Sequence, residues 1–231
     1  MEEQLWKACS DGRAEEVKQL LQNEQINTNW QDLEHSRTPF YIACKNGHIE
    51  IVKLLLNDNR VDITKTQSKE ATPLWIACQE GQIEVVKLLL NDPRVDINKA
   101  TNRSETPFYI ACQEGHIEIV KYMLSCGREI DINKAKNNST NTQNPFLMVT
   151  WTPLEVSKQR SSGYKFLGEA EEEFQKAKRN CPKIVKLIEI AQRNQNQNET
   201  KMKKELAVCK FFFYVRNIYF LLLLFFLYIL N

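Results

Sequence analysis

Apolar residues in the first two thirds of the chain recur with the period of an amphipathic helix. In residues 83–90 they fall on one face (Ile83, Val86, Leu89 and Leu90), while Glu84 and Lys87 fall on the opposite face. A shorter apolar segment precedes this stretch, and residues 95–97 after it alternate between apolar and polar side chains. The pattern predicts two short antiparallel helices followed by an extended arm that leads to a turn.

This block of residues occurs three times in succession. Residues 38–66 and 72–100 are identical at 20 of 29 positions, and a third copy starts at Thr106. The copies begin 34 residues apart, at Thr38, Thr72 and Thr106. A fixed period of this length is typical of repeat proteins, in which each unit contacts mainly its neighbours. We therefore predict a stack of repeated units.

Each copy opens with Thr-Pro and carries a glycine after the first apolar segment. A threonine N-cap followed by proline favours the start of a helix, so Thr-Pro should begin the first helix of each unit. Glycine adopts a positive φ at little cost and is expected to end that helix at Gly47, Gly81 and Gly115. Ala-Cys pairs supply small side chains where helices must approach closely, at residues 43–44, 77–78 and 111–112.

The sequence TPxxxAC followed by GHIEIVKLLL resembles the ankyrin repeat, whose period is about 33 residues and whose units open with T-P-L-H-x-A. The resemblance implies a mostly α-helical ankyrin-repeat solenoid of stacked helix-turn-helix units with β-hairpin loops. The extra residue per unit falls after the second helix, where residues 91–94 replace a shorter glycine-containing turn. We expect it to lengthen a loop without disturbing the stack.

Degenerate copies flank the three clear ones. Cys9, Gly12 and Val17 each lie 35 residues before their counterparts in the next unit, which indicates an N-terminal capping repeat. The pattern restarts at Thr152 and continues at Ile184, with insertions of about 11 and about 19 residues. We predict an ankyrin-repeat domain over residues 1–196, with units near 3–37, 38–71, 72–105 and 106–150 and a degenerate cap at 151–196.

Charge and cysteine usage narrow the classes of function. Lys plus Arg number 31 and Asp plus Glu number 29, so no strong positive field attracts nucleic acid, and no nucleic-acid partner is expected. The N-terminus shows no secretory signal, so the seven cysteines should be free thiols in a reducing compartment. Four of them occupy one position in successive units and should serve packing: Cys9, Cys44, Cys78 and Cys112.

No pattern typical of catalysis or of metal binding is visible in the chain. HExxH, GxSxG, GxxxxGK[ST] and GxGxxG motifs are absent, and Cys126, Cys181 and Cys209 lack the spacing of a zinc site. His48 and His116 follow turn glycines and should make local capping contacts. The sequence therefore predicts a noncatalytic protein without a cofactor or a metal.

In the ankyrin family, partners are usually held by the hairpin tips and by the groove-facing side of the first helices. At the fourth position of each Thr-Pro opening this chain has Tyr41, Trp75 and Tyr109, where the family usually has His. These aromatics either anchor a partner, because they bury a large area at low rotamer cost, or only pack between neighbouring units. Their expected solvent-facing neighbours are Lys45, Asn46, Gln79, Glu80, Gln113 and Glu114, and the tips contribute His35, Arg37, Lys69, Glu70, Arg103 and Glu105.

The C-terminal residues 211–230 form an apolar run that follows a polar, basic linker at 197–210. A helix of this length would span about 30 Å, the thickness of the hydrocarbon core of a bilayer. Arg216 near one end could reach the headgroups, and the upstream lysines favour a cytosolic N-terminal side. Residues 211–231 are therefore a candidate transmembrane tail. A gene-model artefact and the truncated start of a multi-span protein are the alternatives.

These features predict a noncatalytic scaffold or adaptor that binds a protein or peptide through the concave face of its repeat stack. The tips and their neighbours carry charges of both signs, which suits a protein partner better than a phosphate backbone. The repeats should be monomeric and cytoplasmic, with the tail as a candidate membrane anchor. The alternative is the N-terminal regulatory part of a larger or truncated ankyrin-bearing membrane protein, such as a channel or an acyltransferase.

Overall fold

The computed structural model describes residues 1–134, 152–161, 172, 175 and 179–197. It divides into two compact units, Met1–Ile188 and Glu189–Asn231. The described part of the second unit, residues 189–197, is helical. The predicted tail at 211–231 and most of the two predicted insertions lie outside the described residues. No helix in the described part combines the length and the apolar character needed to cross a membrane.

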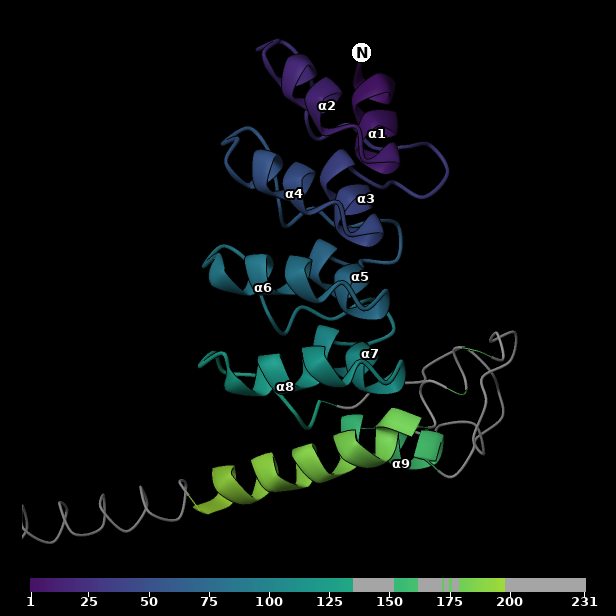
Figure 1. Cartoon of the computed structure of the whole chain (residues 1–231), viewed down its shortest axis with the longest axis vertical. Coiled ribbons are helices and arrows are strands. Elements are labelled where there is room, and N and C mark those ends of the chain that lie inside the picture. The colour runs from purple at the N-terminus through teal and green to yellow at the C-terminus, as the bar shows by residue number, and fades with distance from the viewer. Residues whose placement is uncertain (135–151, 162–171, 173–174, 176–178, 198–231) are drawn as a thin grey trace, which may run out of the picture. The chain divides into compact units, whose positions relative to one another are not determined.

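The first unit consists of successive helix pairs (Figure 1). In the part of the chain that the structure describes, the pairs are α1 (Glu2–Asp11) with α2 (Ala14–Leu21), α3 (Pro39–Asn46) with α4 (Ile49–Leu56), α5 (Pro73–Gln79) with α6 (Ile83–Asn91), and α7 (Pro107–Gln113) with α8 (Ile117–Ser125). Helix α9 (Pro153–Ser161) follows, and residues 179–188 are also helical. The predicted repetition of two-helix units is confirmed.

The helices of this unit form two layers (Figure 1). Helices α1, α3, α5, α7 and α9 pack on one another in chain order, and α2, α4, α6 and α8 form the second layer. Each first-layer helix between two others also contacts its own second-layer partner, so most of its faces are covered. All residues of 39–44, 73–78 and 107–112 are buried, and each Ala-Cys pair is completely inaccessible. The small side chains therefore lie where the layers approach most closely.

The predicted helix boundaries are confirmed by cap geometry. The hydroxyl oxygens of Thr38, Thr72 and Thr106 accept hydrogen bonds from the backbone N–H groups three residues later, at 3.0, 3.1 and 3.0 Å. Gly47 and Gly81 have φ values of 73° and 76°, in the left-handed region that glycine adopts without strain. Local sequence thus determines where each first helix begins and ends.

The buried face of the second helix differs slightly from the predicted one. In α6, Val86, Leu89 and Leu90 are buried as expected, but Val85 is buried in addition and Ile83 is only half-buried. The reason is that α6 packs against α5 on one side and against α4 and α8 on the others. A prediction based on one amphipathic face underestimates the surface that a helix buries when it packs against several neighbours.

The predicted β-hairpin loops are wrong for the residues that the structure describes, because none of these residues is in a strand. We call the loops 32–37, 67–71 and 101–105 the fingers. Each finger contains two backbone hydrogen bonds. In one of them, of 3.1 Å, the first N–H of the finger donates to its last carbonyl: Asp32 to Arg37, Gln67 to Ala71, and Thr101 to Glu105. In the other, of 2.8–3.0 Å, the N–H of the residue before the last donates back to the first carbonyl. A positive φ at Ser36, Glu70 and Ser104 makes the tight turn. These bonds join only the two ends of each finger and do not continue into a ladder, so the fingers are turns.

Neighbouring fingers are joined to one another by backbone hydrogen bonds. The N–H of Ser68 donates to the carbonyl of His35 at 3.0 Å, and the N–H of Asn102 donates to the carbonyl of Lys69 at 3.1 Å. These bonds connect equivalent turns of successive repeats. They fix the spacing of the fingers, and therefore of the side chains at their tips.

The last repeat departs from the pattern of the others. Thr152 and Glu155 form a reciprocal cap: the carboxylate of Glu155 accepts from the N–H of Thr152 at 2.7 Å, and the hydroxyl of Thr152 accepts from the N–H of Glu155 at 3.3 Å. Arg160 is 1% exposed, and its Nε donates to the carbonyl of Gln113 at 3.2 Å. Helix α9 is therefore attached to α7 by a buried polar contact.

Candidate binding groove

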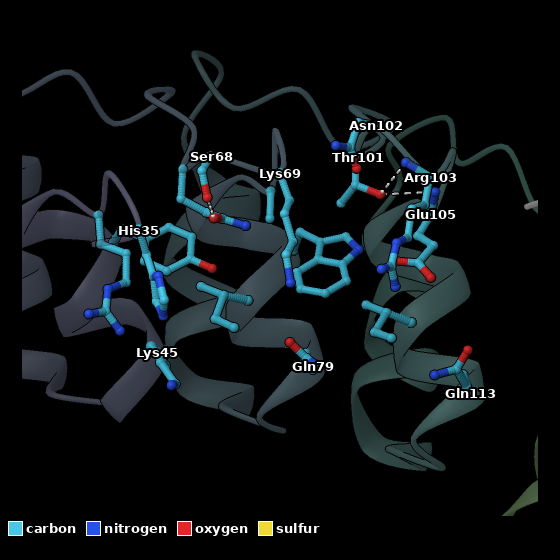
Figure 2. A pocket seen from close by; sticks show the side chains of 17 residues that line it. His35, Lys45, Ser68, Lys69, Gln79, Thr101, Asn102, Arg103, Glu105 and Gln113 are labelled. Atoms are coloured by element: carbon cyan, nitrogen blue, oxygen red, sulfur yellow. Dashed lines mark hydrogen bonds between the residues drawn. The ribbon is translucent and has the colours of Figure 1, made fainter. Parts of the chain in front are cut away.

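A groove of about 430 Å³ lies between the fingers and helices α3, α5 and α7 (Figure 2). Its walls come from three successive repeats because each repeat contributes one finger and one helix. The lining residues are His35, Arg37, Tyr41, Lys45, Gln67, Ser68, Lys69, Ala71, Trp75, Ile76, Gln79, Thr101, Asn102, Arg103, Glu105, Ile110 and Gln113. Many of the residues that the sequence analysis selected are thus brought together around one depression.

Two sets of side chains, each with one member from every repeat of the groove, face each other across it. The finger ladder consists of His35, Lys69 and Arg103, which occupy the same turn position in successive fingers. The helix ladder consists of Lys45, Gln79 and Gln113, near the ends of the three helices. Figure 2 shows the finger ladder along one side of the groove and the helix ladder along the other.

The aromatic ladder, Tyr41, Trp75 and Tyr109, lies deeper than the finger and helix ladders. Its members are 4%, 9% and 0% exposed, so all three pack between neighbouring units. Burial raises the pKa of the Tyr41 and Tyr109 hydroxyls well above its usual range. Tyr41 and Trp75 also line the groove, whereas Tyr109 does not. The structure thus places Tyr41 and Trp75 in the floor of the groove, and Tyr109 in the core.

The other predicted site residues that do not line the groove are Asn46, Glu70, Glu80 and Glu114. Asn46 is used in packing the repeats: its amide donates to the carbonyl of Ser10 at 2.8 Å. The carboxylate of Glu114 accepts from the amide of Gln113 at 2.8 Å. Glu70 and Glu80 are exposed, and Glu70 forms the turn of its finger.

Trp6 is a member of the aromatic series that the sequence analysis missed. The offset of 35 residues that pairs Cys9 with Cys44 also pairs Trp6 with Tyr41, so the signal was available. The indole Nε1 of Trp6 donates to the carbonyl of Arg37 at 3.0 Å, and the guanidinium of Arg37 lies 5.3 Å from the centre of the ring. Arg37 in turn donates to Asp32 at 2.6 Å. The first finger is thereby tied to α1.

Trp75 occupies the equivalent position two repeats later but lacks this contact. Its indole Nε1 is buried and has no acceptor among the residues that the structure describes. A buried donor without an acceptor costs free energy, so such groups are rare in folded proteins. This one lies in a residue that lines the groove.

Among the described residues, some of the positively charged side chains around the groove are paired with a carboxylate, and others are not. Arg37 is neutralised by Asp32, whereas Lys45, Lys69 and Arg103 form no ion pair within the described part of the chain. The carboxylate in the lining belongs to Glu105, which is 7% exposed. The groove therefore carries an excess of positive charge although the whole chain is nearly neutral.

Neither the histidines nor the cysteines assemble into a chemical site in the described residues, where no three metal-binding side chains lie together. The prediction of local caps at His48 and His116 is wrong. Their Nε2 atoms lie 3.0 Å from the carbonyl of Ser10 and 2.8 Å from that of Gln79, each in the preceding repeat. Burial raises the pKa of the Cys9 thiol to about 12, which keeps it protonated and unreactive.

Comparisons with known proteins agree with the repeated architecture. A family model described as ankyrin repeats (3 copies) matches residues 2–67 and 59–136. Over 52 residues the chain is 38% identical to ankyrin repeat domain-containing protein 7 of Homo sapiens, an alignment that covers 22% of this chain and 20% of that protein. The chain thus matches about a fifth of the length of this curated relative. Because the family model covers more than half of it, the chain belongs to the ankyrin-repeat family.

Proposed function

We propose that the chain is a noncatalytic interaction module that binds an extended segment of another protein in the groove between its fingers and first helices. The observation that carries the proposal is the pair of facing ladders. Lys69 and Arg103 on the finger side, and Gln79 on the helix side, have side chains with no partner within the described residues. Side chains that are held in register but not used inside the fold are available to a partner.

The period of the ladders favours an extended ligand. Packed helices lie about 8–10 Å apart, so three successive repeats present equivalent side chains over about 20 Å. An extended chain advances about 3.3 Å per residue, so a segment of about six residues has this length. Tyr41, Trp75, Ile76 and Ile110 supply apolar surface between the two ladders. This combination of an apolar floor and polar walls is common in sites that bind peptides.

A catalytic function is not proposed. The buried cysteines have a raised pKa because burial disfavours the thiolate, which is the nucleophilic form. His48 and His116 are occupied with carbonyl groups of the neighbouring repeat. Most of the polar side chains in the groove are amides, hydroxyls and long cations, which suit recognition of a ligand.

We also propose that residues 211–230 attach the chain to a membrane with the repeats in the cytosol. This proposal rests on the apolar sequence alone. The test is carbonate-resistant recovery with membranes of the full chain and of a truncation ending at Ala207; equal recovery of both contradicts an anchor. The alternative, a regulatory part of a larger channel or acyltransferase, is distinguished by sequencing the transcript beyond Asn231.

The groove is tested by selecting peptides from a random display library on the full chain in non-ionic detergent. Gln79→Trp should block the groove, because Gln79 lines it and its side chain has no partner within the part of the chain that the structure describes. Lys87→Trp is the matched control on the exposed surface of α6. We expect peptides that bind the parent and the Lys87→Trp variant but lose binding to Gln79→Trp. Recovery of no such peptide contradicts the proposed function.

A further inference from the structure

In the part of the chain that the structure describes, three cationic side chains of the groove form no ion pair that would stabilise the fold. Lys45, Lys69 and Arg103 come from three successive repeats, and within the described residues none of them has a carboxylate partner. Other lysines of the same repeats behave differently: Lys53, Lys87 and Lys121 lie on the second-layer helices and pair with glutamates at 2.8, 2.7 and 2.8 Å. At this repeated position of α4, α6 and α8 the lysine is paired, whereas these three cations that line the groove are not paired among the described residues.

Two of these cations, Lys69 and Arg103, lie on the finger side of the groove. Figure 2 shows the Lys69 side chain running from its finger into the groove, between His35 and Arg103. The backbone bonds between neighbouring fingers hold these three residues in register. Like charges held on one wall repel one another, which is unfavourable in the free chain and is relieved by an anionic ligand. The groove is therefore electrostatically complementary to negative charge.

Trp75, which also lines the groove, carries a hydrogen-bond donor that is unsatisfied within the part of the chain that the structure describes. Its buried indole Nε1 has no acceptor in the described residues, whereas the equivalent atom of Trp6 donates to a carbonyl at 3.0 Å. Both tryptophans occupy the same repeat position, so the missing acceptor is a property of this part of the chain. The oxygen atom of a ligand that reaches Nε1 from the groove would satisfy this donor. Peptide carbonyls and carboxylates both supply such an oxygen.

The chemistry of the lining favours carboxylates over phosphates as the negative groups. Phosphate sites commonly use arginine forks or clusters of backbone N–H groups. Here Arg37 is already paired with Asp32, so Arg103 is the one guanidinium left free among the lining residues. Glu105, on the same wall, repels a doubly charged phosphate more strongly than a singly charged carboxylate. Separate point charges such as Lys45 and Lys69 suit separate carboxylates along a chain.

We propose that the partner segment is an extended acidic peptide whose Asp or Glu side chains pair with Lys45, Lys69 and Arg103, while one of its oxygen atoms accepts from the indole Nε1 of Trp75. This inference rests on the proposed function of the groove and specifies the chemistry of its ligand. Alternating carboxylates along about six residues match the length of the two ladders.

The test compares two triple variants of the full chain that change the net charge equally. Lys45→Gln/Lys69→Gln/Arg103→Gln removes the free cations of the groove, and Lys53→Gln/Lys87→Gln/Lys121→Gln removes the same number of cations from the second layer. Random ten-residue peptides are selected on the parent and on both variants. One enriched peptide is then labelled with fluorescein and titrated by anisotropy, together with its counterpart in which Asn and Gln replace Asp and Glu.

We expect peptides selected on the parent and on the second-layer variant to be enriched in Asp and Glu, and those selected on the groove variant to lose this enrichment. The labelled acidic peptide should bind the groove variant at least about tenfold more weakly, and the amide peptide should lose a similar factor on the parent. Peptides that depend on Gln79 but show no acidic enrichment overturn this inference and leave the proposed function standing. If no selected peptide depends on Gln79, both fail.

Discussion

The imidazole Nε2 of His116 lies 2.8 Å from the carbonyl oxygen of Gln79, which belongs to the preceding repeat. The same contact recurs along the stack: His48 meets the carbonyl of Ser10 at 3.0 Å, and the amide of Gln82 donates to the carbonyl of Lys45 at 3.1 Å. The residue before each second helix therefore satisfies a carbonyl near the end of the previous first helix. These contacts hold the helix ladder of the groove in register.

Replacing His116 by glutamine should preserve this contact, because Gln82 makes it at the equivalent position of another repeat. Replacing it by alanine leaves the Gln79 carbonyl without that partner and should lower the free energy of unfolding by about 0.5–1.5 kcal/mol. Urea unfolding followed by circular dichroism measures both variants. Equal destabilisation by glutamine and alanine would show that the packing of the imidazole ring, and not its hydrogen bond, stabilises the stack.

Gly81→Ala should be more destabilising than Gly127→Ala. Both glycines have a positive φ, 76° and 77°, which costs an alanine about 1–2 kcal/mol. A Cβ at Gly81 would lie 2.5 Å from the Cε1 atom of His116, whereas a Cβ at Gly127 meets nothing within 4 Å. The difference between the two variants isolates the clash with the imidazole. Thermal unfolding of both variants at one protein concentration gives the comparison, and equal losses contradict the predicted close approach.

Acid should weaken the stack through the aspartates beside the loop arginines. Hydrogen bonds from Arg60 and Arg94 lower the pKa of Asp58 and Asp92 below the usual value of 3.8. A carboxylate with a lowered pKa in the folded state stabilises the fold above 3.8, and this contribution is lost as the pH falls through the folded value. Asp58→Asn should therefore flatten the dependence of unfolding free energy on pH below about 4. Glu129→Gln, at an exposed residue, is the control, and an unchanged slope in Asp58→Asn refutes the assignment.

Thiol labelling should separate the described cysteines into two groups. Cys126 is partly exposed, whereas Cys9, Cys44, Cys78, Cys112 and Cys181 are buried. Burial raises the pKa of the first four of these thiols. We expect a maleimide reagent at pH 8 to modify Cys126 at least about tenfold faster than the five buried thiols. Peptide mapping by mass spectrometry, with denatured chain as the reference, gives the rates. Comparable labelling of Cys78 in the native chain would contradict a packed cysteine stack.

Much of the fold could be predicted from local sequence. The threonine caps, the turn glycines and the period of 34 residues all act over short distances, so their structural effect can be inferred residue by residue. The loops between the helix pairs were harder to predict. Residues 95–97, which precede the third finger, alternate like a strand, but they form no strand in the structure. Whether an extended segment pairs into a ladder depends on its neighbours in space.

The groove could be predicted only in part. The repeat period placed His35, Lys69 and Arg103 at equivalent tips, and the structure brings them to one wall. The depth of the aromatic ladder and the differing partners of Trp6 and Trp75 depend on packing across repeats, which the period does not reveal. The pairing of Arg37 with Asp32 likewise decides which cations remain free.

Site-specific photo-crosslinking tests the binding of a protein segment in the groove most directly. A benzophenone amino acid replaces Gln79 in the groove or, as the control, Lys87 on the exposed surface of α6, in the full chain expressed in its native cells. We predict discrete protein adducts from the Gln79 position that disappear in the presence of an excess of the selected acidic peptide, and none of these adducts from the Lys87 position. Identical adducts from both positions, or adducts that the peptide does not displace, would contradict the account.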